Sequence, residues 1–206
     1  MKKISVATIA FILLALVACD SNPQKPAVTK TPAPPEYVTG RTAFQNLYVS
    51  ARAFAADVKP YQLQSIYTPG SPAAKGEAAI WYAGFASPSK RQLKVFTMCG
   101  ITAENAPERG ISHTTEDTYS DVNSSTKIWE PPFLKVDSDK AYEVAQKQGG
   151  EKLTAKDPNQ PVTFVLGWDT QRGALQWHVI YGVNPMDAKL RIVVDATTGV
   201  YVKTEH

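Results

Sequence analysis

The feature that most constrains the fold is a pattern that occurs twice along the chain. In each half a tryptophan precedes a turn with proline, and an apolar, strand-like run begins five residues after that proline. The two copies are Trp81, Ser87-Pro88 and Leu93-Lys94-Val95-Phe96, and Trp177, Asn184-Pro185 and Leu190-Arg191-Ile192-Val193. Each copy follows a helical pattern and a strand-like segment, which indicates a degenerate duplication. The alternative is a chance similarity between two amphipathic hairpins.

The first half is predicted to begin with a helix. Apolar residues recur at steps of three and four from Phe44 to Val58, which is the spacing of one helix face. Thr42 and Gln45 have the spacing of a capping box, and Pro60 is expected to end the helix.

The second half is predicted to begin with a helix over residues 138–148. Asp137 or Ser138 can cap it, and Gly149-Gly150 is expected to stop it. Strands are predicted at 62–67, 77–85 and 91–98, and then at 162–168, 174–181, 189–195 and 199–203; residues 111–119 are either a further strand or an irregular excursion. The sequence thus predicts an α+β fold of two related units, residues 42–132 and 133–206, each a helix packed on a small antiparallel β-sheet. No role is predicted for residues 100–132.

The first 18 residues have the features of an export signal. A basic start, Lys2-Lys3, precedes an apolar run that is shorter than the roughly 20 residues needed to span a bilayer. The run ends in Leu16-Val17-Ala18-Cys19, which resembles the lipobox of bacterial lipoproteins. The resemblance implies cleavage between Ala18 and Cys19 and a covalent lipid on Cys19, with no other cofactor. An ordinary signal peptide that is cut nearby is the alternative.

Residues 19–41 are predicted to form a lipidated start and a flexible stalk. Five prolines stand among small and polar residues, a composition that cannot bury a core and favours extended conformations. Asp20 resembles the signal that retains enterobacterial lipoproteins in the inner membrane, and it weakly favours that membrane. The expected location is a lipid-anchored position on the inner or the outer membrane, facing the periplasm or the exterior.

The charge of the chain argues against nucleic acid as a partner. The 22 basic and 19 acidic residues give a net charge of +3, and removal of Lys2 and Lys3 lowers it by two. No cluster of basic residues is present that could follow a phosphate backbone. Acylation of Cys19 would leave Cys99 without a disulfide partner, and its position at the end of an apolar strand predicts a half-buried, inert thiol.

The second half carries a longer pattern as well. It consists of Ser138–Ala145 with Gly149-Gly150, then Tyr181, and then the run from Leu190 to Val202. Over residues 136–204 this pattern resembles a PepSY domain, whereas the first half matches only through the repeat. PepSY domains occur in propeptides of secreted metallopeptidases and in exported bacterial proteins, so the resemblance implies a binding or inhibitory module. No peptidase domain follows in the chain, so a target is expected to be another chain.

The second half also contains a candidate binding face. Gln176 and His178 alternate with apolar neighbours along one predicted strand, and Lys189 and Arg191 do so along the next. If a helix covers the apolar face, these four residues line an open, mildly basic face that could dock a partner; a solvated face is the alternative. Asp195 and Gly199 are expected to build the turn that follows, with the carboxylate accepting backbone amides.

Trp129 is the remaining candidate for binding. It lies in a loop-like segment rich in large apolar groups, and it is expected either to fasten the two halves together or to dock a partner. A second expectation concerns the first half, where one face of the sheet would carry Trp81 and Val95 and the opposite face would carry Ile80, Tyr82, Phe96 and Met98. A sheet that is apolar on both faces needs a cover, from the second half or from a partner.

No catalytic or metal site is predicted. His113, Glu116 and Asp117 crowd one segment, but one histidine and two acids make a poor metal pattern, and no nucleophile triad or phosphate loop is found. The expected function is a non-catalytic module that binds an envelope protein or peptide in a regulatory, inhibitory or assembly role. The alternatives are an envelope hydrolase, with an acid/base pair among these residues and Asp121, and an accessory subunit of a larger envelope complex.

Overall fold

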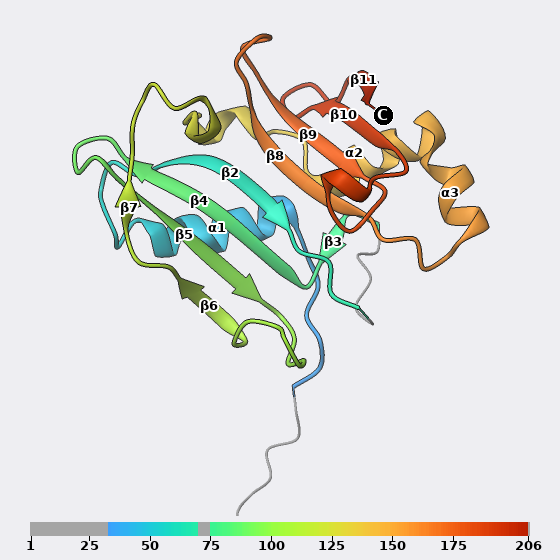
Figure 1. Cartoon of the computed structure of the whole chain (residues 1–206), viewed down its shortest axis with the longest axis horizontal. Helices are drawn as coiled ribbons and strands as arrows, with labels where there is room; N and C mark the ends of the chain where they lie inside the picture. Colours follow the sequence, from blue (N-terminus) through green and yellow to red (C-terminus); the bar gives the residue numbers. More distant parts are fainter. Residues whose placement is uncertain (1–32, 70–74, 206) are drawn as a thin grey trace, which may run out of the picture. The chain divides into compact units, whose positions relative to one another are not determined.

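Strands from both halves of the chain join in one antiparallel sheet (Figure 1). The computed structural model describes residues 33–69 and 75–205, so Ala18, Cys19, Asp20 and most of the predicted stalk lie outside the described residues. The first half supplies β2 (Lys59–Ser65), β4 (Ile80–Ser87), β5 (Gln92–Cys99) and β6 (Gly110–His113). The second half supplies β8 (Thr163–Asp169), β9 (Ala174–Ile180), β10 (Arg191–Asp195) and β11 (Tyr201–Glu205).

The two halves meet at the centre of this sheet. The strand order is β11-β10-β9-β8-β2-β4-β5-β6, with Gln62 opposite Gly167 and Gln64 opposite Val165 where β2 pairs with β8. β7 (Asp117–Thr118) also pairs with β5, and β1 (Val38–Thr39) forms a separate ladder with β3 (Glu77–Ala78). The predicted α+β class is confirmed. In each half the strands run in chain order from the centre to an edge, which is compatible with the predicted duplication.

Helices cover one face of the sheet. α1 (Gly40–Ala51) packs on β4 and β5 and lies behind them in Figure 1, and α2 (Ser138–Ala145) packs on β9 and β10. A distorted turn, η3 (Gln146–Gly150), links α2 to α3 (Glu151–Lys156). Short 3-10 turns lie at η1 (Ser124–Thr126), η2 (Pro131–Phe133) and η4 (Pro185–Asp187).

The predicted helix ends need correction. α1 ends at Ala51, well before Pro60, which lies within β2 next to a bulge, where a missing amide is tolerated. The Gly149-Gly150 pair does not stop the second helix; Gly149 has φ +113° and bends the chain, and helical structure resumes at Glu151.

The two tryptophans of the repeat occupy matching places in the core. The Trp81 indole donates from Nε1 to the Val38 carbonyl at 3.0 Å, and Trp177 donates to the Val136 carbonyl at 2.9 Å. Each acceptor precedes the first residue of its helix, Gly40 or Ser138, by two positions. The rings meet edge to face, with centroids 6.4 Å apart. The repeated indole bond therefore ties the start of each helix to its own sheet.

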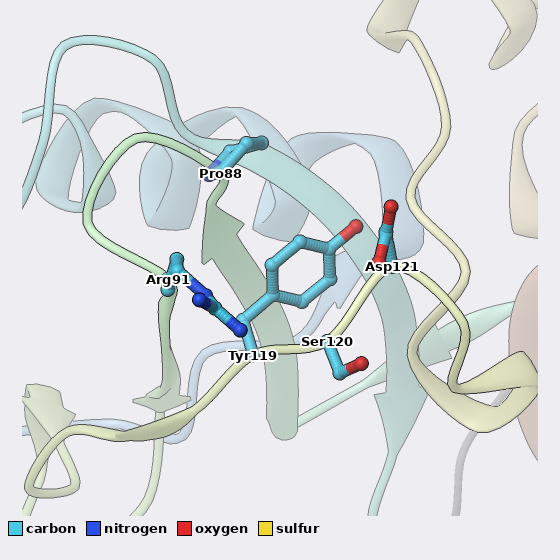
Figure 2. A pocket seen from close by; sticks show the side chains of 5 residues that line it. All are labelled: Pro88, Arg91, Tyr119, Ser120 and Asp121. Carbon is cyan, nitrogen blue, oxygen red and sulfur yellow. The ribbon is translucent and has the colours of Figure 1, made fainter.

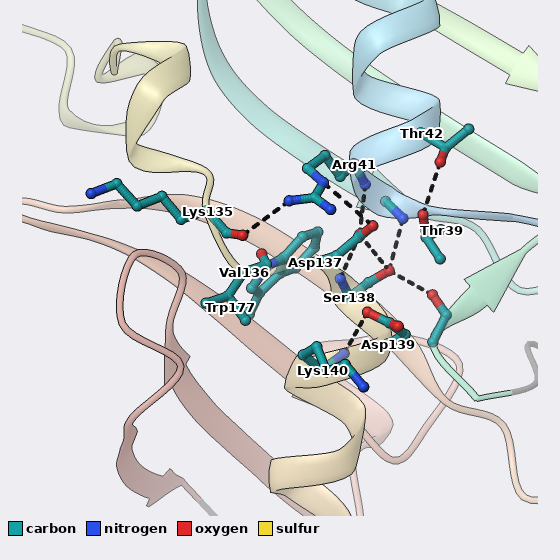
Figure 3. Close-up of polar contacts among 12 residues, drawn as sticks. Thr39, Arg41, Thr42, Lys135, Val136, Asp137, Ser138, Asp139, Lys140 and Trp177 are labelled. Atoms are coloured by element: carbon teal, nitrogen blue, oxygen red, sulfur yellow. Dashed lines mark hydrogen bonds and ion pairs between the residues drawn. The ribbon is translucent and has the colours of Figure 1, made fainter.

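The starts of α1 and α2 face each other across this core (Figure 3). The Gly40 amide donates to Ser138 Oγ at 2.7 Å, and the Arg41 amide donates to Asp137 Oδ1 at 2.8 Å. The same Asp137 oxygen accepts the Ser138 amide at 2.7 Å, and Arg41 Nε lies 3.7 Å from the other carboxylate oxygen. One carboxylate thus caps two helices, and the predicted capping box at Thr42 and Gln45 does not form the start of α1.

Strand register corrects the expected faces of the first half. Trp81 pairs with Met98 and Ala83 pairs with Phe96, so the side chains of Phe96 and Met98 share the helix-covered face with Trp81. Ile80 does lie on the opposite face, but this chain covers it, with Tyr37, Ile101 and Ala106 packed around Ile80 and Cys99. The residues 100–132 therefore cover both ends of that face, because Tyr119 and Ile128 pack on Tyr61 and Ala86.

Candidate binding face

Between these two covers, a row of side chains crosses the sheet on the face opposite the helices. Register places one residue from each of seven neighbouring strands in line: Thr97, Tyr82, Gln64, Val165, His178, Val193 and Lys203. The chain neighbours of most of these residues belong to the helix-side core, so the pleat directs the row away from the helices. We call this row the open face; Val193 within it is fully buried.

The middle of the open face is polar and ordered. The Tyr82 hydroxyl and the Gln62 Nε2 amide both donate to Gln64 Oε1. Burial raises the pKa of Tyr82, so its hydroxyl stays protonated as a donor. Gln64 Nε2 has no hydrogen-bond acceptor among the described residues, and it remains available to a carbonyl group of a partner.

The β11 end of the open face carries a charged cluster around Glu205. Its carboxylate lies 2.7 Å from Lys203 Nζ, 3.1 Å from Arg191 Nη1 and 3.6 Å from His178 Nδ1. Burial lowers the pKa of His178, and Arg191 and Lys203 act in the same direction while Glu205 opposes them. With His178 neutral, two cations face one carboxylate, so the cluster carries one net positive charge.

A small hollow of about 210 Å³ adjoins this cluster. Val165, Ile180 and Pro185 form its apolar walls, and His178 and Arg191 border it. Arg191 also donates from Nη2 to the Pro185 carbonyl at 3.2 Å, whereas its buried Nε has no hydrogen-bond partner in residues 33–69 and 75–205. An apolar hollow beside a guanidinium group suits an apolar side chain next to an acidic one.

Two of the residues predicted for the binding face do not reach the surface. Gln176 is 1% exposed and Trp129 is 2% exposed, with the Trp129 ring stacked 5.3 Å from Phe44 of α1. Trp129 is therefore a core residue of the first half and not a docking group. Lys189 is exposed but precedes β10, and its ammonium group donates to Gln160 Oε1 at 2.7 Å.

The remaining two predicted residues, His178 and Arg191, do come together. His178 Nδ1 and Arg191 Nη1 both contact the Glu205 carboxylate. Glu205 was missed because the last strand was predicted to end at Lys203, and Lys203 was missed because its pairing with Val193 was not predicted. Gln64 and Val165 were missed because no local signal indicates that β2 pairs with β8. The strand alternation found the correct face, whereas the pairing that assembles it is non-local.

The turn predicted at Asp195 is also described. Asp195 Oδ1 accepts the amides of Thr197 and Thr198 at 2.9 and 2.7 Å and the Thr198 hydroxyl at 2.9 Å. Gly199 has φ +77°, a conformation that glycine adopts without strain. All acceptor contacts of Asp195 Oδ1 are thus local to the turn between β10 and β11.

The acids and histidine of the middle segment do not converge on a pocket. His113, Glu116, Asp117 and Asp121 are all exposed, and Glu116 forms an ion pair with Lys94 at 2.7 Å. No group of three or more potential metal ligands gathers within the described ranges. His113 and Asp121 border two different hollows, so these four residues do not line one common pocket.

Two further observations concern the Cys99 thiol and the length of the helices. Cys99 is buried, more fully than expected, and its thiol donates to the Ile101 carbonyl at 3.3 Å. Among residues 33–69 and 75–205, no helix has the length and apolar character needed to cross a bilayer.

Comparison with known proteins shows a shared fold. No protein-family model and no curated protein matches the chain. Among solved structures, the chain is similar to the crystal structure of a candidate lipoprotein (CD1622) from Clostridium difficile 630, with a TM-score of 0.53 and 11% sequence identity. The similarity covers 79% of this chain and 91% of that one.

Proposed function

We propose that the protein is a lipid-anchored envelope protein that binds a segment of another envelope protein and catalyses no reaction. The lipobox-like Leu16-Val17-Ala18-Cys19 supports the anchor, and the proline-rich composition of residues 19–41 supports a spacer. The shared fold with a candidate lipoprotein agrees with this proposal. Asp20 weakly favours the inner membrane over the outer one, and the body faces the periplasm or the exterior.

The observation that carries the binding role is the open face. It combines an aromatic hydroxyl, a free amide and an apolar hollow on rigid strands, and it ends in a cluster with one net positive charge. The Tyr side chain supplies contact area and a hydrogen bond at low entropic cost. The partner is a peptide segment that presents an acidic residue to Arg191 and Lys203 and an apolar residue to the hollow.

The PepSY resemblance supports the same class of role. The elements that carry it, α2 and the strands β8 to β11, supply the half of the open face that holds the charged cluster. A regulatory or inhibitory action on a partner chain fits this arrangement. An accessory role in a larger envelope complex is the second candidate, and it uses the same face.

The anchor is tested by intact mass spectrometry of the protein extracted from its native membrane. The proposal predicts a chain that starts at Cys19 and carries the added mass of acyl chains, and a Cys19→Ala variant that is released from the membrane. An unmodified Cys19 or a retained Met1 would show that the proposal is wrong.

The binding role is tested by site-specific photocrosslinking in cells. A photoreactive residue at Thr97 on the open face should yield a discrete crosslinked product, and Lys203→Gln should reduce its yield. The matched control is the same probe at Val49, which is 73% exposed on α1, on the helix side of the sheet. Equal crosslinking at both positions, or a yield that Lys203→Gln does not change, would contradict a role for the open face.

A further inference from the structure

A second hollow lies outside the open face, at the end of the β4–β5 hairpin (Figure 2). Its volume is about 300 Å³, which corresponds to about ten water molecules. The hairpin supplies Pro88 and Arg91, and the segment after β7 supplies Tyr119, Ser120 and Asp121. In Figure 2 the Tyr119 ring stands between the guanidinium group and the carboxylate, with its hydroxyl directed toward Asp121.

The polar groups of this hollow lack partners within the described parts of the chain. Tyr119 is 5% exposed and its ring packs on Tyr61 and Ala86, while its hydroxyl borders the hollow and makes no hydrogen bond to a described residue. Burial raises the pKa of Tyr119 and the charge of Asp121 adds to this, so the hydroxyl is a neutral donor. Arg91 and Asp121 form no ion pair with each other or with another described residue.

Arg91 is held in an unfavourable backbone conformation. Its φ is +53°, in the left-handed region that favours glycine. The Arg91 amide donates to the Pro88 carbonyl at 3.2 Å, and its carbonyl accepts the Tyr119 amide at 3.0 Å, so the hairpin and the covering segment fix this conformation. Lys75 and Asn105 adopt the same left-handed conformation, so what distinguishes Arg91 is that its side chain borders the hollow.

We propose that this hollow binds a small zwitterion, of the size of a free amino acid or a dipeptide. Arg91 receives the carboxylate, Asp121 receives the ammonium group, and the Tyr119 hydroxyl donates to an oxygen of the ligand. Two opposite charges that do not neutralise each other, with a donor between them, match a ligand that carries both charges. The side chains of Arg91 and Asp121 are solvated, so we expect a Kd on the order of 1 mM.

The test is saturation-transfer NMR on the full chain in detergent, with four probes. L-alanine and L-alanyl-L-alanine carry both charges, acetate carries only the negative one, and N-acetylalanine methylamide carries none. The zwitterions should give saturable signals, and the better of the two identifies free amino acids or dipeptides as the source of the ligand. Acetate and the neutral probe should bind about tenfold more weakly or not at all, because acetate lacks one charged contact and the neutral probe lacks both.

Arg91→Gly separates the site from the fold. This variant removes the charge and relieves the positive φ, so we expect about tenfold weaker zwitterion binding with a Tm that is unchanged or raised. Lys75→Gly is the matched control, because Lys75 is an exposed cation with φ +52°; it should leave binding unchanged. Tyr119→Phe should weaken binding without lowering the Tm. Equal signals from all four probes, or zwitterion binding that survives Arg91→Gly, would overturn the proposal.

Discussion

Gly40 is the residue that permits the close approach of α1 to the two core tryptophans. A Cβ atom at this position would lie 2.6 Å from Cη2 of Trp177 and 3.1 Å from Cη2 of Trp81. We predict that Gly40→Ala lowers the free energy of unfolding by about 1–3 kcal/mol, because both rings would have to move in a packed core. Urea unfolding measures the change. Gly167→Ala is the control, since no atom lies within 4 Å of its added methyl group, and a similar loss there would contradict the explanation.

His178 is expected to make stability depend on pH. Its pKa is lowered in the folded protein, first by burial, from a usual value of 6.5. The unfolded chain therefore binds the proton more readily, and stability is lost as the pH falls below about 6.5 toward the folded pKa. We predict that His178→Gln flattens the decline of the urea midpoint between pH 7.5 and pH 5. His113→Gln, at an exposed position on β6, should leave the decline unchanged; equal effects would refute the assignment.

Among the elements, the joint cap of α1 and α2 is the contact most sensitive to a single change. Asp137 accepts amides from the first turns of both helices, and each lost cap costs about 1 kcal/mol. We predict that Asp137→Ala lowers stability by about 2 kcal/mol, and that Asp137→Asn loses less because an acceptor oxygen remains. Asn123→Ala, which uncaps only the exposed turn η1, is the comparison in the same thermal denaturation assay. Equal losses would show that Asp137 caps only one helix.

At this same scale, the sequence predicted elements better than their boundaries. Alternation and three-to-four spacing of apolar residues predicted both major helices and most strands, because apolar residues mark the buried side of each element. The start of α1 was missed since its cap comes from Ser138 and Asp137, which no local spacing links to Gly40. The end of the second helix was misjudged because Gly149 has the positive φ of a stop, yet the chain continues as helix.

At the scale of the whole molecule, β2 pairs with β8 at a seam that joins the two halves in one sheet, so we expect the halves to unfold together. Ser65 lies at this seam, and its buried hydroxyl accepts the Phe164 amide at 2.9 Å. Ser65→Ala would leave that amide unpaired, and we predict a loss of about 1–3 kcal/mol. Hydrogen exchange should show equal loss of protection in β4 and β9. A loss confined to one half would show that the halves unfold separately.

The whole-molecule arrangement also explains which part of the candidate site the sequence could predict. The alternation of side chains along β9 placed His178 on the correct face of the sheet. The neighbours that turn His178 into part of a surface arrive from β2, β8 and β11, through pairings between residues far apart in the chain. The burial of Trp129 likewise could not be predicted from the sequence, because the Phe44 ring that stacks on it lies at the opposite end of the first half.

The joint cap determines when α1 can become fully hydrogen-bonded during translation. α1 is synthesised early, but the amides of Gly40 and Arg41 have no side-chain acceptors until Asp137 and Ser138 have been synthesised. A product that terminates before Asp137 would leave those amides bare and one edge of β2 unpaired, the state that proteases and chaperones recognise. Chains truncated before Asp137 should therefore be degraded, and only the full-length protein should accumulate in the cell.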